Sequence, residues 1–123
     1  MKILIVEDEE ALSAVMREKL EKEDYEVEVV DNGDDVVPAC KKFKPNLIML
    51  DMVLPKKHGL EVLKDLKADL KLKEIPVIVL SNLDTDTDIK KALTLGADDY
   101  FVKAHHPINE VVEKVRAYSV KGQ

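Results

Sequence analysis

The chain has 123 residues, of which 46% are hydrophobic and 36% charged, and a formal net charge of −6. This length and composition are typical of one soluble globular domain. The acidic charge argues against direct binding of nucleic acid, and no apolar run approaches the roughly 20 residues that span a membrane. The first residues lack the long apolar region of a secretory signal, so we expect a cytoplasmic protein. The lone Cys40 excludes an internal disulfide.

Five short apolar runs alternate with amphipathic stretches along the chain. The runs predict strands at residues 3–6, 27–30, 47–50, 77–80 and 100–102. The intervening stretches carry apolar residues at helical spacing, as in Leu12, Met16 and Leu20. Strands that alternate with helices form parallel sheets through right-handed crossovers. The sequence therefore predicts an α/β fold, with helices on both faces of a mainly parallel sheet.

The composition of the runs also predicts their order in the sheet. The first, third and fourth runs are uninterrupted apolar, as expected of strands covered on both faces, whereas Glu28 interrupts the second. The fifth is short and carries aromatic residues, so the second and fifth runs suit the edges. With these two edges, 2-1-3-4-5 is the natural order, as in other doubly wound folds. Pro38 is harder to place. In a helix that began near Asp34 it would clash with a carbonyl, so we expect an irregular first turn there.

Four of the runs end in polar residues suited to phosphoryl chemistry. Glu7 and Asp8 follow the first run, Asp51 the third, Ser81 the fourth and Lys103 the fifth. Parallel strands open their carboxyl ends on one edge of a sheet, so these residues should meet there. Three carboxylates about 5 Å apart would repel one another by roughly 3 kcal/mol per pair at an effective dielectric of about 20, so both a lysine and a cation are needed. Ligands that are all oxygen favour Mg²⁺ or Mn²⁺.

Four motifs, in order, carry a resemblance to a known family: VEDEE, DMVLPKKHG, LSN and GADDYFVK. Over essentially its whole length the chain resembles the receiver domain of the response regulators of two-component systems. The resemblance implies a doubly wound, flavodoxin-like fold, with five parallel strands in the order 2-1-3-4-5 flanked by five helices. We expect a single receiver domain over residues 1–123, similar to the stand-alone chemotaxis regulators, with no output domain. A receiver cut from a longer chain fits the same sequence.

The resemblance also implies how the acidic residues act. Asp51 would be the nucleophile and would accept a phosphoryl group from a sensor histidine kinase or a phosphotransfer protein. Asp8, Asp51 and the Val53 carbonyl would bind Mg²⁺ directly, while Glu7 would act through water. The chain would then not be an enzyme in the usual sense, because it would catalyse only its own phosphotransfer and autodephosphorylation.

The remaining polar residues would complete the site and transmit its state. Ser81 and Lys103 would hold the other phosphoryl oxygens. Tyr100 occupies the position of the family's switch aromatic, which moves inward when the phosphorylated site pulls on the hydroxyl residue, here Ser81. The fourth helix, fifth strand and fifth helix would then carry the signal to a downstream protein that the sequence does not identify. We expect a monomer or weak dimer without direct contacts to nucleic acid or membrane.

Several departures from the family pattern bear on these expectations. Ala104 stands where the family usually has a proline after a cis peptide, so either the loop that holds Lys103 is rebuilt or a cis bond costs about 3 to 4 kcal/mol. Val53 and Leu83 flank the path of water to the phosphoryl group, and both are apolar, which predicts a persistent aspartyl phosphate.

Two alternative functions are less consistent with the sequence. An aspartyl phosphatase would need a second Asp where Val53 stands, and the complete set of polar residues disfavours a binding module that is never phosphorylated.

Overall fold

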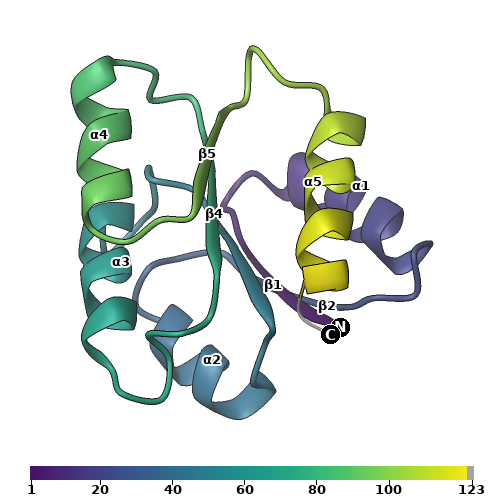
Figure 1. The fold of residues 1–123 in the computed structure, drawn as a ribbon, viewed down its shortest axis with the longest axis horizontal. Helices are drawn as coiled ribbons and strands as arrows, with labels where there is room; N and C mark the ends of the chain where they lie inside the picture. The colour runs from purple at the N-terminus through teal and green to yellow at the C-terminus, as the bar shows by residue number, and fades with distance from the viewer. Residues whose placement is uncertain (122–123) are drawn as a thin grey trace.

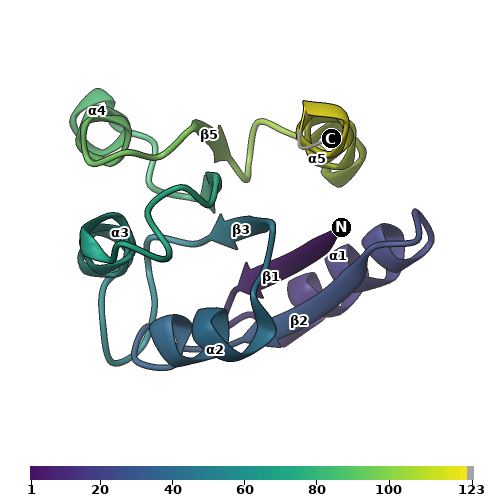
Figure 2. The same cartoon turned by 60° about the horizontal axis from the view of Figure 1, so that its bottom comes forward.

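The computed structural model describes residues 1–121, which form alternating strands and helices arranged in three layers (Figure 1). In chain order the elements are β1 (Lys2–Val6), α1 (Glu10–Glu21), β2 (Glu26–Val30), α2 (Val36–Phe43), β3 (Leu47–Leu50), α3 (Gly59–Ala68), β4 (Val77–Ser81), α4 (Asp86–Thr94), β5 (Asp99–Val102) and α5 (Ile108–Lys121). Helices α2, α3 and α4 cover one face of the sheet, and α1 and α5 cover the other (Figure 2). The predicted α/β architecture is confirmed.

The sheet has five parallel strands in the order β2-β1-β3-β4-β5, as predicted. Every residue of β3 and β4 is buried, whereas in β2 Glu26 is exposed and Glu28 and Val29 are partly exposed. The interruption by Glu28 thus marks an edge strand, because only edge strands can leave such a side chain partly in water.

Two hydrophobic cores lie on the two faces of the sheet. Along β1, Leu4 and Val6 pack against α2, α3 and α4, while Ile3 and Ile5 pack against α1 and α5. All four side chains are almost completely buried. Burial of such aliphatic side chains stabilises the fold by roughly 1.5 to 3 kcal/mol each, which holds the polar ends of the strands in fixed positions.

The helix that contains Pro38 begins later than the sequence suggested. Residues 34–35 form a turn and α2 starts at Val36, which makes Pro38 the third residue of the helix. The backbone N–H of that position has no partner within a helix, so proline costs little there. The expected irregularity therefore takes the form of a turn before the helix.

Local signals mark the starts of α3 and α4 and the end of α4. His58 accepts a hydrogen bond from the Leu60 N–H (3.2 Å) at the start of α3, and Thr85 accepts one from the Asp88 N–H (3.1 Å) at the start of α4. Gly96, with φ of +113°, follows α4 in a conformation that favours glycine.

No helix in the described part of the chain is long and apolar enough to cross a lipid bilayer.

Candidate functional site

The carboxyl ends of four strands bring the predicted polar residues to one edge of the sheet. Glu7 and Asp8 follow β1, Asp51 follows β3, Ser81 ends β4 and Lys103 follows β5. Backbone hydrogen bonds continue the sheet into these positions. The Asp51 N–H donates to the carbonyl of the last residue of β1 (3.1 Å), and the Lys103 N–H donates to the Ser81 carbonyl (2.9 Å). The convergence expected from parallel strands is therefore present.

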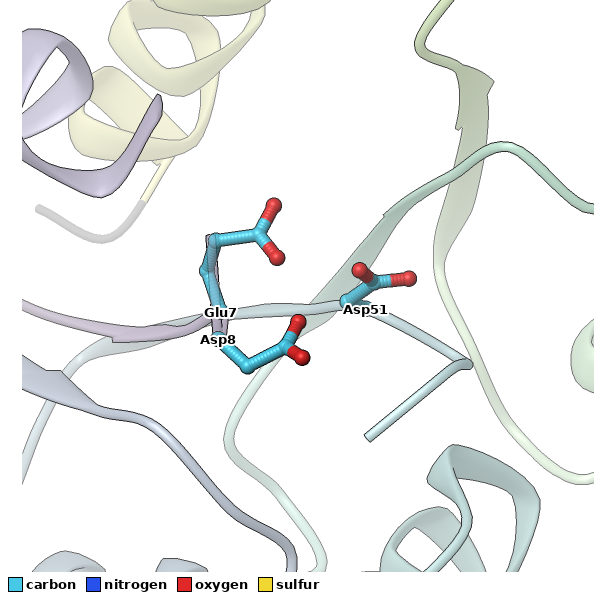
Figure 3. Close-up of side chains that lie close together, drawn as sticks. All are labelled: Glu7, Asp8 and Asp51. Atoms are coloured by element: carbon cyan, nitrogen blue, oxygen red, sulfur yellow. The ribbon is translucent and has the colours of Figure 1, made fainter. Parts of the chain in front are cut away.

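Three carboxylates and one ammonium group form the centre of this edge. The side chains of Glu7, Asp8 and Asp51 extend into one space (Figure 3), and a carboxylate oxygen of each lies within 4.8 Å of the others. Glu7 is 4% exposed and Asp51 6%, whereas Asp8 is exposed. The Lys103 ammonium donates to Asp51 Oδ2 (2.9 Å) and to Glu7 Oε1. One partly buried cation is thus shared by two buried carboxylates.

Burial acts in opposite directions on the pKa values of Glu7 and Lys103. The Glu7 carboxyl has its pKa raised to about 7, chiefly because burial disfavours its charged form; the hydrogen bond from Lys103 lowers the pKa, and neighbouring Asp51 raises it again. Burial lowers the pKa of Lys103, but its hydrogen bonds to Glu7 and Asp51 outweigh that influence and leave it raised. Lys103 therefore stays charged at neutral pH, whereas Glu7, with its pKa raised to about 7, is close to half protonated there unless another cation is near.

The residues at this edge fit a divalent cation. When all three carboxylates are ionised, they exceed the charge of Lys103 by two, and Asp8 forms no hydrogen bond or ion pair within residues 1–121. Hard oxygen donors of this kind suit Mg²⁺, which typically binds one or two carboxylates and keeps several waters. Val53 donates its backbone N–H to Asp51 Oδ1 (3.2 Å). The role of its carbonyl as a ligand stays a prediction.

Ser81 and Tyr100, the two predicted switch residues, belong to one hydrogen-bonded unit. Ser81 is fully buried, and its Oγ accepts a hydrogen bond from the Leu83 N–H (3.3 Å). The Tyr100 hydroxyl donates to the Leu83 carbonyl (2.6 Å). Burial raises the pKa of Tyr100, and a hydrogen bond between its side chain and Ser81 acts in the opposite direction. The site is therefore connected to Tyr100 through the loop between β4 and α4.

The loop that carries Lys103 is built without proline. The described residues contain no cis peptide bond, so the bond between Lys103 and Ala104 is trans. The ring of His106 packs edge-on against Phe101 with 5.1 Å between ring centroids, and its Nδ1 lies 2.8 Å from Glu110 Oε1. These contacts anchor the loop between β5 and α5, and the trans bond before Ala104 means that the loop carries no cis peptide.

One residue that the sequence reasoning missed is Gly59, at the start of α3. A Cβ atom there would lie 2.5 Å from the Met52 Cα and 2.6 Å from the Asp51 carbonyl oxygen. The Gly59 N–H also donates to the Met52 carbonyl (2.9 Å). Only a residue without a side chain lets α3 begin so close to the backbone that carries Asp51. A glycine inside the first turn of a predicted helix, where it lowers helix propensity, was the available signal.

Comparisons with known proteins show which family the chain belongs to. A family model described as the response regulator receiver domain matches residues 3–116. The chain is 37% identical over 116 residues to the alkaline phosphatase synthesis transcriptional regulatory protein PhoP of Bacillus subtilis (strain 168), with 94% of this chain and 47% of that protein covered. The chain belongs to the response regulator receiver family of two-component systems.

Solved structures of similar proteins share the fold over nearly the whole chain. The BeF3-activated N-terminal receiver domain of Klebsiella pneumoniae RstA has a TM-score of 0.88 at 30% identity, covering 96% of this chain and 97% of that one. The phosphorylated cyanobacterial phytochrome response regulator RcpA has a TM-score of 0.81 at 33% identity, covering 94% and 89%. The chain spans slightly less than half the length of the curated relatives it matches. The prediction of a single domain without an output domain stays a prediction.

Proposed function

We propose that this receiver accepts a phosphoryl group on Asp51 from a sensor histidine kinase or a phosphotransfer protein, in a reaction that depends on Mg²⁺. The observation that carries the proposal is the partly buried Lys103 ammonium, which bonds to Asp51 and Glu7 beside the third carboxylate of Asp8. Such an arrangement concentrates anionic ligands around one nucleophile and supplies one fixed cation. Family membership and the phosphorylated state of the similar RcpA support the same function.

The proposed chemistry begins with the orientation of Asp51. Its Oδ1 accepts from the Val53 N–H and its Oδ2 from Lys103, so the carboxylate is held in one orientation before a donor arrives. An ionised carboxylate needs no general base. One Asp51 oxygen forms a bond to phosphorus as the bond from phosphorus to the donor's imidazole nitrogen breaks, and the electron pair of the broken bond stays on that nitrogen. Lys103 and the Ser81 hydroxyl then donate to phosphoryl oxygens.

The proposed metal ligands are Asp8, Asp51 and the Val53 carbonyl, with Glu7 acting through water. When bound, Mg²⁺ would neutralise part of the charge on the phosphoryl oxygens as an anionic donor approaches. Asp8 supports this assignment, because its exposed carboxylate is not engaged by any other group in the described chain. The Val53 assignment is supported by the family resemblance and by the position of this residue two places after Asp51.

We also propose that Ser81 and Tyr100 relay the phosphorylated state to the surface formed by α4, β5 and α5. The support is their connection through the Leu83 backbone, together with the light anchoring of α4, of which only Ala92 is buried. A helix with so little buried surface can shift at low cost. We expect the downstream partner to be a protein, because the acidic chain offers nucleic acid little attraction. We expect a monomer or weak dimer.

Two other functions make different predictions. An aspartyl phosphatase would release phosphate from many donors, but the acid and base it needs two residues after Asp51 is replaced by the apolar Val53. A binding module would fold and bind partners without ever being phosphorylated. The retention of Lys103 in contact with Asp51 favours the phosphoacceptor over both.

Intact mass spectrometry tests the proposal directly. The chain is incubated with Mg²⁺ and acetyl phosphate beside the matched variant Asp51→Asn. We expect a gain of about 80 Da, one phosphoryl group, in the native chain alone. Omission of Mg²⁺ should abolish the gain. An equal gain in Asp51→Asn would assign the phosphoryl group to another residue, and a gain in neither chain would favour the binding module.

A further inference from the structure

A groove between α3 and α4 lies outside the proposed phosphoryl site. Its volume is about 550 Å³, and none of the residues assigned to phosphorylation, metal binding or switching lines it. Leu60 and Leu95 supply apolar surface, and both pack against the core beneath the two helices. A volume of this size lies within the range of small-molecule sites, roughly 300 to 1,000 Å³, whose walls are mostly apolar with a few polar groups.

Three lysines, Lys64 of α3 and Lys90 and Lys91 of α4, surround this apolar surface. Within residues 1–121 none of the three forms an ion pair or a hydrogen bond with its side chain, and no acidic residue lines the groove. Glu61 and Asp86 lie one helical turn from Lys64 and Lys90, yet they pair with neither. In a chain with a net charge of −6, these three lysines form a local group of unpaired positive charges.

The groove lies on the side of α4 that faces α3. Its α4 residues, including Thr87, Lys90, Lys91 and Thr94, follow one another at helical spacings of three and four, so they share the side of the helix that faces α3. A molecule bound there would contact α3 and α4 at once. It would therefore tie the lightly anchored α4 to its neighbour.

We propose that the α3–α4 groove binds a small organic phosphate, in which an apolar body of drug size lies on Leu60 and Leu95 and the phosphate lies among Lys64, Lys90 and Lys91. Ammonium groups bind phosphate as point charges, and several together offset the two negative charges of a phosphate monoester. The hydroxyls of the two lining threonines add neutral donors. The volume suits such a ligand rather than a long peptide segment.

Amide NMR of the full chain tests this proposal with naphthyl phosphate as the probe. EDTA replaces Mg²⁺, so that no added cation attracts the probe to Asp51. We expect saturable shifts confined to residues 60–64 and 87–95. Binding should be at least about tenfold weaker for naphthol, which lacks the phosphate, and for inorganic phosphate, which lacks the apolar ring. Shifts centred on Asp51, or the absence of saturable binding, would overturn the proposal.

Charge variants separate this groove from general attraction of anions. The triple variant Lys64→Gln, Lys90→Gln and Lys91→Gln should lose at least about tenfold in affinity for naphthyl phosphate. A matched control replaces three exposed lysines elsewhere, Lys22, Lys42 and Lys73, by Gln and changes the net charge equally. Its affinity should be unchanged. An equal loss in both triple variants would mean that the probe follows net charge, and the groove would not be a site.

Discussion

Replacement of Glu7 by Gln should stabilise the metal-free protein at alkaline pH. The Glu7 carboxyl is buried, and its pKa is raised from 4.5 to about 7, mainly by that burial. Between these two values the folded state keeps a proton that the unfolded state has lost, so the free energy of unfolding falls as pH rises through this window. The variant Glu7→Gln has no such group to ionise, and its amide oxygen can still accept the hydrogen bond from Lys103.

The magnitude follows from the size of the pKa displacement. At about 1.4 kcal/mol per pKa unit, the penalty for ionising Glu7 reaches about 3 kcal/mol once pH is well above 7. The free energy of unfolding of Glu7→Gln minus that of the native chain should therefore be near zero at acidic pH, below 4.5, and rise by about this amount by pH ~8.

Urea unfolding at a series of pH values, in EDTA, measures this difference. Asp8→Asn is the matched control, because it removes one carboxylate from the same edge of the sheet at an exposed position. Addition of Mg²⁺ at alkaline pH should stabilise the native chain more than Glu7→Gln, since a cation offsets the buried charge. If the Glu7→Gln difference is the same at both ends of the pH series, the raised pKa of Glu7 is wrong.

Two further predictions concern the backbone behind Asp51 and the lifetime of its phosphorylated form. Gly59→Ala should lower the free energy of unfolding by about 1 to 3 kcal/mol in urea titrations, because the added Cβ would lie 2.5 Å from the Met52 Cα; full native stability would show that α3 can move away at no cost. The aspartyl phosphate should persist well beyond seconds when phosphate release is followed after chemical phosphorylation, because the apolar Val53 and Leu83 cannot orient an attacking water. Val53→Asn, which adds a polar group at a half-exposed position, should shorten that lifetime, and release within seconds from the native chain would contradict the argument.

The sequence alone determined the architecture and the edge where the site lies. The apolar runs end within one residue of the observed strands, because a strand covered on both faces has to be apolar along its buried length. Once the strands are parallel, their carboxyl ends must share an edge. The positions of Glu7, Asp51 and Lys103 directly after β1, β3 and β5 therefore followed from the pattern of the chain without any knowledge of side-chain packing.

Only the tertiary structure decided how those groups interact. Lys103 bonds to both Asp51 and Glu7, which lie 52 and 96 residues away in the chain. These bonds depend on how deeply each side chain is buried and on its orientation. The same holds for the raised pKa of Glu7 and for the absence of any room for a side chain at Gly59. Periodicity in a sequence reports which face of an element is apolar. Contact distances and desolvation arise only when elements far apart in the chain are packed together.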